Sequence, residues 1–426
     1  MRPATALLIT ALAASALTAC SIVKPVDATK ARASRGPIAI WYSNNPQEVQ
    51  WGNQVVKSWN AAHPGEKASG QQIPTGKTSE AVIQASVIAG TEPCLIYNTS
   101  PASVPSFQAI GGLVALDQFP GGRQYIEQRS GSQADQYRSP DGKFYQLPWK
   151  SNPVMIFYNK KLFTKAGLDP NHPKLASYAD FLATAKRVVS THAARFAIYP
   201  APSSEFFQSW YDFYSMYAAQ SGGVQLIKNG KATFDDAAGR GVANFWRQIY
   251  ADGLAGKETY SGDPFADGVA AMAIVGPWAI ASYQGKVGWG LAPVPTSNGQ
   301  PSNHTFSDAK NVAMYASCTH RETAWDFLKF STSQDQDGKF LQATGQMPMR
   351  TGVVTTYASY FAKNPAYKTF AKLADGVVEV PNVPGSVRIW QTFRDAWSKS
   401  VIFADGSVDA TLAATAQSID QLLVKK

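Results

Sequence analysis

The stretch "AAMAIVGPWAIASY", residues 270–283, decides the fold, because its short apolar run stops at Gly276-Pro277-Trp278. The apolar run is typical of a buried strand. Pro277 has a fixed φ and no amide hydrogen, so it suits the first turn of a helix. Trp278 is therefore expected at the start of a helix and at the carboxyl end of a strand. In open α/β sheets, ligands bind at that edge.

Strands and helices alternate along the rest of the chain. The sequence predicts a strand at residues 37–42 ("PIAIWY") and a helix at 47–62, in which Trp51, Val55, Val56 and Trp59 recur at helical spacing. A second predicted helix, 79–89, leads to a strand at 94–97 ("CLIY"). This order is typical of an α/β lobe.

The segment "YQLPWKSNPVMIFYNKKLF", residues 145–163, is extended and is punctuated by Pro148 and Pro153, so we expect it to connect two lobes. A chain of 426 residues with 45% hydrophobic residues can form two or three compact units. Residues 177–190 predict a helix capped by Ser177, with Asp180 completing a capping box. Aromatic side chains at 204–217 cover every side of a predicted helix, so at least one should face away from the core.

The N-terminus resembles an export signal with a bacterial lipobox. An uncharged, weakly apolar segment follows Arg2 and closes on Leu17-Thr18-Ala19-Cys20. We expect residues 1–19 to be removed as a signal peptide, Cys20 to carry a lipid, and residues 20–36 to form an anchor and flexible tether. The alternative is a chance cysteine after an alanine-rich leader.

The formal net charge of +9 falls to about +8 without Arg2, and the basic residues are scattered. The balance indicates general electrostatics of a cell envelope rather than a nucleic-acid partner. We expect a monomer.

Two cysteines remain, Cys94 and Cys318. In a compartment that permits disulfides they could form one bridge, or they could be two buried thiols. The cysteines and the five histidines have no zinc-site spacing, and no metal site or cofactor is expected. No serine-nucleophile, phosphate-loop or zinc-protease motif occurs, so no residue is predicted to be catalytic.

Aromatic residues recur at the predicted ends of strands and helices, beside Asn, Ser, Gln, Asp and Arg. Such rings can stack on the apolar faces of sugars while the polar side chains bind hydroxyl groups. For any single ring a place in the core is the more common role. Trp278 is the exception, because its turn holds it at a sheet edge.

"FADGVAAMAIVGPWAI" resembles a segment of the extracellular sugar-binding proteins of ABC importers, the class that includes maltose-binding protein. The resemblance runs from about residue 37 to 423. Other stretches are similar in the family's order: "IAIWYSN", "VIAGTEPCLIYNTS", "DGKFYQLPWKSNPVMIFYNKKLFTKAGL", "ETAWDFLKFSTS", "TGQMPMRTGV" and "VPNVPGSVRIWQTFRDAW".

The resemblance implies an α/β, two-lobed periplasmic-binding-protein fold of the class II type, with a ligand cleft between lobes joined by a multi-segment hinge. The expected N-lobe comprises 37–152 and 305–335. The expected C-lobe comprises 153–304 and most of 336–426, with closing helices.

The resemblance also implies site residues. Trp278 and Trp390 fall where family tryptophans stack on sugar, and Asn98 stands where maltose-binding protein has a stacking tryptophan. Asp308 lies in a stretch that departs from the family's Gly-Gly-rich return. The predicted ligand-binding residues are Tyr42, Ser43, Asn44, Asn98, Trp149, Ser151, Gln208, Trp210, Gly276, Trp278, Asp308, Arg350 and Trp390.

The resulting prediction is a lipid-anchored receptor outside the cytoplasmic membrane. It captures a sugar or oligosaccharide by hinge closure and delivers it to the transmembrane subunits of an ABC permease. One alternative is the same fold binding a phosphorylated or otherwise anionic solute such as a glycerophosphodiester, which Lys150, Lys310 and Arg350 would favour. A secreted glycan hydrolase and a structural envelope lipoprotein are more remote alternatives.

Overall fold

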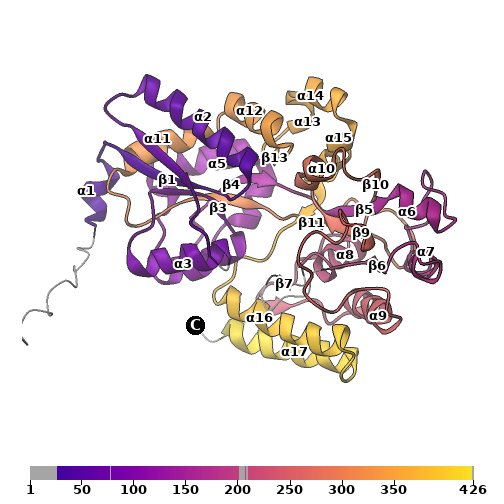
Figure 1. The fold of residues 1–426 in the computed structure, drawn as a ribbon. Coiled ribbons are helices and arrows are strands. Elements are labelled where there is room, and N and C mark those ends of the chain that lie inside the picture. Colours follow the sequence, from indigo (N-terminus) through magenta and orange to yellow (C-terminus); the bar gives the residue numbers. More distant parts are fainter. Residues whose placement is uncertain (1–25, 77, 201–206, 208–209, 425–426) are drawn as a thin grey trace, which may run out of the picture.

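Two separate β-sheets organise the chain into two lobes (Figure 1). The computed structural model describes residues 26–76, 78–200, 207 and 210–424. The predicted signal peptide, Cys20 and Gln208 lie outside the described residues. In the described part of the chain, no helix combines the length and the apolar character that crossing a bilayer requires.

The N-lobe contains a six-stranded sheet in the order β13-β4-β12-β3-β1-β2. β1 is parallel to β2 and β3, whereas β12 is antiparallel to β3 and β4. The strands are β1 (Ile38–Tyr42), β2 (Ala68–Gln72), β3 (Leu95–Thr99), β4 (Leu147–Ser151), β12 (Lys310–Met314) and β13 (Met347–Pro348). The main helices of this lobe are α2 (Pro46–Ala62), α3 (Ser79–Ala89), α4 (Val104–Ala109), α5 (Gly122–Ser130), α11 (Arg321–Ser331) and α12 (Gln334–Thr344).

The C-lobe contains a four-stranded sheet in the order β10-β5-β9-β6, in which β6 is parallel to β9 and β5 is antiparallel to both neighbours. Its strands are β5 (Met155–Asn159), β6 (Phe196–Ile198), β9 (Ala270–Val275) and β10 (Trp289–Ala292). Its helices include α6 (Lys160–Lys165), α7 (Tyr178–Ser190), α8 (Phe213–Gln220), α9 (Ala237–Ala251), α10 (Trp278–Tyr283), α13 (Val353–Thr356), α14 (Ala358–Lys363), α15 (Pro365–Ala371), α16 (Ser386–Trp397) and α17 (Val408–Val424).

The predicted strands at 37–42 and 94–97 and the predicted helices at 47–62, 79–89 and 177–190 form close to their expected bounds. The helix predicted at 204–217 is corrected, because α8 begins only at Phe213, and residues 204–206, 208 and 209 lie outside the described residues. α3 covers the predicted residues 79–89, and Ser177 caps α7 by accepting a hydrogen bond from the Asp180 amide. β2 was missed, because "ASGQQ" is largely polar and lies at the edge of the sheet, where one face is solvated.

The N-lobe extends further along the chain than expected. Phe340 of α12 packs in the N-lobe core, and β13 pairs with β4 at the edge of the first sheet. The expected boundary at residue 335 therefore falls inside this lobe, and the chain leaves it near Arg350. The helices α13 to α15 then pack on the C-lobe.

The last part of the predicted flexible tether is folded, which corrects the expectation for residues 28–36. A short helix, α1 (Ala28–Arg32), is capped by Asp27 and buries Ala31. Arg35 forms ion pairs with Glu66 at 2.7 Å and Asp326 at 2.6 Å. The segment is therefore attached to the N-lobe beside α11 (Figure 1).

The lobes are joined by several segments that lie together. The first crossing, residues 152–154, connects β4 to β5, and the second, 307–309, precedes β12. The Asn152 amide donates to Ser307 Oγ at 3.0 Å, and the Asp308 amide donates to the Asn152 carbonyl at 3.1 Å. A two-stranded sheet of β11 (Thr305–Phe306) and β14 (Val377–Val378) completes the hinge.

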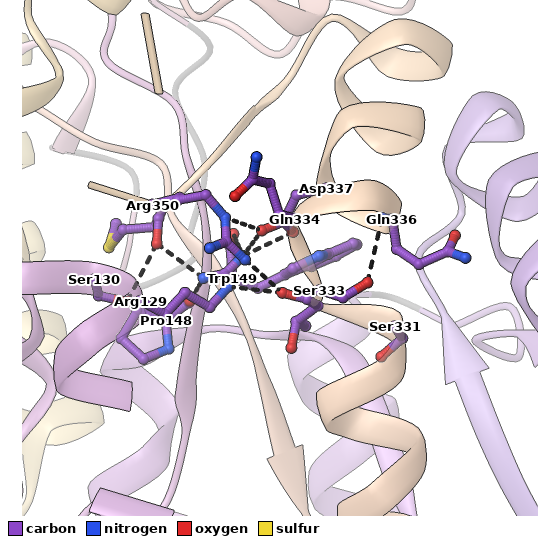
Figure 2. Close-up of polar contacts among 12 residues, drawn as sticks. Arg129, Ser130, Pro148, Trp149, Ser331, Ser333, Gln334, Gln336, Asp337 and Arg350 are labelled. Atoms are coloured by element: carbon purple, nitrogen blue, oxygen red, sulfur yellow. Dashed lines mark hydrogen bonds and ion pairs between the residues drawn. The ribbon is translucent and has the colours of Figure 1, made fainter. Parts of the chain in front are cut away.

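A buried arginine connects the segments that lead to the hinge (Figure 2). Arg129 Nη2 lies 2.9 and 3.0 Å from the two carboxylate oxygens of Asp337. Its guanidinium also donates to the carbonyls of Pro148, Trp149, Thr332 and Met349. Side-chain exposures of 1% for Arg129 and 0% for Asp337 exclude water from this pair.

Cys94 and Cys318 form a disulfide that links the chain just before β3 to the chain that follows β12. This settles the choice that the sequence left open. The bond closes a loop with a sequence separation of 224 residues. A crosslink over so long a loop restricts the unfolded chain strongly.

We therefore expect the double variant Cys94→Ser, Cys318→Ser to lose about 2–4 kcal/mol of unfolding free energy. Urea denaturation monitored by circular dichroism measures this loss. The bond lies at the edge of the N-lobe sheet away from the hinge, so ligand affinity should not change. An unchanged denaturation midpoint would show that the loop closure contributes nothing.

Candidate ligand-binding site

The N-lobe sheet brings several predicted site residues to one edge. Lys310 at the start of β12 pairs with Lys150 near the end of β4, and Asn311 pairs with Thr99 at the end of β3. Asn98, Ser151 and Asp308 are therefore at the same edge. Ser43 follows β1 there as well, and its hydroxyl accepts a hydrogen bond from the Asn45 amide.

Carboxylates neutralise the two lysines of this edge. Lys310 Nζ lies 3.3 Å from Glu80 Oε1 and 3.5 Å from Asp308 Oδ1. Burial alone would lower the pKa of Lys310, but the nearby carboxylates reverse the effect and hold its pKa above the ordinary value. Lys150 Nζ lies 2.5 Å from Glu48 Oε1, and both side chains are only 3% exposed.

The C-lobe presents a hollow with a volume of about 440 Å³ at the carboxyl edge of its own sheet. Tyr199 follows β6, and Trp278 follows β9, so the ends of these parallel strands meet there. β5 begins at the same edge and is separated from β4 by only three residues, so the two sheet edges approach each other at the hinge. The wall of the C-lobe hollow includes Phe207, Tyr211 and Tyr283.

Gly276 explains how Trp278 is held at this hollow. A Cβ atom at Gly276 would lie 1.9 Å from Cζ3 and 2.5 Å from Cε3 of the Trp278 ring. The ring thus folds back over the glycine, and no larger residue leaves room for it. Trp278 remains partly exposed, and the ring of Tyr211 meets it edge-on at a centroid distance of 6.5 Å.

Tyr211 and Asp308 connect the hollow to the hinge. Burial raises the pKa of Tyr211 well above its ordinary value, and the negative charge of Asp308 raises it further. Glu379, which follows β14, is 2% exposed. Its carboxylate accepts hydrogen bonds from Tyr137 Oη at 3.2 Å and from the Val380 amide at 2.8 Å. Burial raises the pKa of Glu379 well above its ordinary value.

Three predicted ring contacts are not available at this site. Tyr42 is 2% exposed and its ring packs on Gly52 and Gly70. Trp149 is 1% exposed between Trp51 and Phe340. Trp390 is 1% exposed in the C-lobe core. Each ring lies on the buried face of its strand or helix, so the expected ligand contacts of Tyr42 and Trp149 and the expected stacking role of Trp390 are corrected to core packing.

Two further predicted residues have structural partners. Arg350 Nε lies 2.9 Å from Asp337 Oδ2, so its guanidinium belongs to the buried hinge pair (Figure 2). Trp210 is 6% exposed and packs near Phe306 at 5.8 Å. Asn44 is exposed beside the N-lobe edge. The residues that the structure brings to the two edges are therefore Ser43, Asn44, Asn98, Ser151, Gly276, Trp278 and Asp308.

The sequence did not single out Tyr199, Tyr211, Glu48, Glu80 or Glu379 as site residues. Glu48 and Glu80 lie in the first turns of α2 and α3, which begin at the N-lobe edge. That position was a usable signal, because acidic residues favour helix N-termini. Nothing in the local sequence distinguished Glu379. Among the described residues, no group of His, Cys, Asp or Glu is placed to hold a metal ion.

Two lobes with sheet edges that approach each other at a multi-segment hinge, and an aromatic hollow at one of these edges, are the architecture of a ligand-binding protein. Residues 43–338 match the family described as "Bacterial extracellular solute-binding protein", and this chain belongs to that family. Its members bind solutes and are not enzymes, so the hydrolase alternative is set aside.

Sequence identity to individual members and relatives of this family is low. The chain is 23% identical over 308 residues to the maltodextrin-binding protein MdxE of Bacillus subtilis, which covers 69% of this chain and 70% of that protein. It is 21% identical over 247 residues to the sn-glycerol-3-phosphate-binding periplasmic protein UgpB of Rhizobium meliloti, covering 55% and 56%. The cyclic alpha-maltosyl-1,6-maltose binding protein of Arthrobacter globiformis superposes with a TM-score of 0.77 at 20% identity, covering 92% of this chain and all of that one. The structural match confirms the predicted fold.

The Glu379 carboxyl should make stability depend on pH. Its folded pKa is raised, so its contribution is complete below the unfolded pKa of about 4.3. It is lost as the pH rises through the folded pKa, because the unfolded chain releases the proton first. Glu379→Gln removes this pH-dependent loss of stability. The difference in melting temperature between the variant and wild type should therefore grow in favour of the variant as the pH rises from about 4.5 to about 8. Thermal melts across that range test this, with the exposed Glu258→Gln as control; a difference independent of pH would contradict it.

Proposed function

We propose that this chain captures a neutral sugar or oligosaccharide outside the cytoplasmic membrane and delivers it to an ABC-type importer. The observation that carries the proposal is the partly exposed Trp278 ring, fixed over Gly276 at the edge where the two lobes meet. An aromatic face held in this way suits the apolar face of a sugar ring. The carboxylates and amides of the N-lobe edge suit its hydroxyl groups.

The basic side chains that could bind an anionic ligand are already paired with carboxylates of the protein, which favours a neutral ligand. Lys310, Lys150 and Arg350 each form an ion pair with a carboxylate of the protein. A phosphate would have to break one of these pairs and would meet the carboxylates of Glu80 and Asp308. Leaving a buried charge without its partner is costly.

The anionic alternative keeps one supporting observation, the similarity to the glycerol 3-phosphate-binding relative. Thermal-shift measurements with a panel of neutral mono- and oligosaccharides and with sn-glycerol 3-phosphate separate the two. Ligand at about 100 times its dissociation constant stabilises a protein by about 2.7 kcal/mol. Stabilisation by glycerol 3-phosphate alone would replace the sugar proposal.

Delivery follows from hinge closure in this proposal. Ligand that contacts both lobes favours the closed arrangement, so binding shifts the population toward it. The permease then receives the closed form.

Attachment of the receptor to the membrane through a lipid on Cys20 is supported by the lipobox-like sequence Leu17-Thr18-Ala19-Cys20. Mass spectrometry of the N-terminal peptide from membranes tests it, and an unmodified Cys20 would remove the anchor from the proposal.

The decisive variants are Trp278→Ala and Gly276→Ala. Loss of the ring removes about 1.5–3 kcal/mol of apolar contact, so Trp278→Ala should bind the saccharide that stabilises the wild type about 10- to 100-fold more weakly. Gly276→Ala should also weaken binding, because the added methyl group displaces the ring.

Isothermal titration calorimetry measures both effects. The matched control is Gly288→Ala, where an added Cβ meets no atom within 4 Å. Wild-type affinity in Trp278→Ala would remove this residue from the site.

A further inference from the structure

The outer surface of α3 in the N-lobe carries no charged side chain beyond its first turn. Glu92 is the only charged residue between residues 81 and 116 of the sequence, and it is 7% exposed. α3 packs Ile83 into the N-lobe core, yet the opposite, exposed side of this helix is also largely apolar. A surface helix normally has a polar or charged outer face, and a helix that is apolar all round is normally covered. The outer face of α3 therefore has the composition of a contact surface.

Two isoleucines are the largest apolar side chains on this uncharged surface. Ile88, near the end of α3, is 72% exposed, and Ile110, just after α4, is 55% exposed. The ends of the two helices lie side by side, since a Cβ atom at Gly112 would be 2.3 Å from Val87 Cγ1. We define the base patch as the exposed apolar residues at these two helix ends, Ala85, Ile88, Ala89, Ala109 and Ile110.

The base patch lies at the end of the N-lobe where the chain enters it. Cys94, which follows α3, is bonded to Cys318. Two residues further on, His320 Nδ1 lies 3.0 Å from Ser34 Oγ. Ser34 follows α1, so the attached N-terminal segment and the base patch share one end of the lobe. In Figure 1, α1 lies at the end of the N-lobe that faces away from the C-lobe.

The ligand-binding edge is at the opposite end of the same sheet. β3 begins one residue after Cys94 and reaches the ligand-binding edge at Thr99. Lobe closure acts at that far edge, so it does not cover the base patch. A partner for the patch must therefore come from outside the described chain.

The chemistry of the base patch favours lipid acyl chains over a protein. Its side chains contain no hydrogen-bond donor or acceptor, whereas protein interfaces form about one hydrogen bond per 100–200 Å². Lys30 and Arg32 of α1, at the same end of the lobe, are exposed and form no ion pair in the described part of the chain. The nearby carboxylates of Glu66 and Asp326 are paired with Arg35. An apolar surface flanked by cations is typical of segments that bind at a membrane interface.

Chain length keeps this end of the N-lobe close to a lipid on Cys20. Asp27, which caps α1, is seven residues beyond Cys20. Seven residues span at most about 25 Å when fully extended. A lipid on Cys20 would therefore bring this end of the lobe to the membrane surface.

We propose that the base patch rests on the outer face of the cytoplasmic membrane, with Ile88 and Ile110 at the boundary between lipid headgroups and acyl chains. The inference rests on the lipid anchor of the proposed function and adds a second, non-covalent contact. In this orientation the ligand-binding edge points away from the bilayer. The receptor thus captures its ligand from solution with an unobstructed cleft.

The test uses the lipidated protein in vesicles of phosphatidylcholine and phosphatidylglycerol. Ile88→Cys and Ile110→Cys each provide one free thiol for the fluorophore NBD, since the proposed lipid blocks Cys20 and the other two cysteines are bonded to each other. Both labels should emit at shorter wavelength than NBD in water and should lose emission when the vesicles contain brominated acyl chains. Phe403→Cys is the matched control, because Phe403 is 62% exposed on the C-lobe. Its label should keep the emission of NBD in water and should not be quenched.

Three results would contradict the membrane contact. Labels at positions 88 and 110 that match the label at 403, in protein that floats with the vesicles, would overturn the contact and leave the lipid anchor and the sugar receptor intact. A shift to shorter wavelength without quenching by the brominated lipids would assign the patch to a protein partner or a second copy instead. Failure of the protein to float with the vesicles would overturn the lipid anchor and this contact together, while the thermal-shift measurements would still decide sugar binding.

Discussion

The ion pair between Arg129 and Asp337 is the constraint on which the two-lobed arrangement depends. A guanidinium and a carboxylate that are both removed from water are stable only if their remaining donors and acceptors are satisfied. Arg129 meets this condition by donating to carbonyls of β4, of the chain after β13 and of the chain after α11. These segments are distant in sequence, and the arginine holds them in one fixed arrangement at the base of the N-lobe.

This fixed arrangement determines where the chain can bend. Arg350 is joined to the same carboxylate, so the third crossing leaves the N-lobe from a rigid point. The first two crossings are held to each other by hydrogen bonds between Asn152 and the chain at residues 307–308. In the proposed closure, rotation is therefore expected within short stretches of backbone, and the sheets move as intact bodies. The two binding surfaces can be preformed, since neither has to be rebuilt when the lobes approach.

The sequence was a good guide to the elements and to Trp278, but a poor guide to the other rings. Strands and helices follow from periodicity, and the Gly-Pro-Trp turn indicates a position at a sheet edge without knowledge of distant contacts. The burial of Trp149 and Trp390 depends on which face of an element meets the core, and that is decided by partners such as Phe340 that lie far along the chain. The segment at residues 28–36 folds for the same reason, because the acidic partners of Arg35 come from α11 and from the chain before β2. Local composition could not have indicated them.

The attachment of that segment has a geometric consequence. The chain enters the molecule on the N-lobe, beside α11, whereas α17 ends the described chain on the C-lobe, where Asp420 bonds to Lys231 and Ala232. The two ends of the folded chain thus belong to different rigid bodies. In the proposed closure, a tether on the N-terminus would fix the orientation of the N-lobe, and the C-lobe would move relative to it. The distance between the two ends therefore changes with the angle between the lobes. Energy transfer between fluorophores placed near residues 28 and 424 would measure that angle.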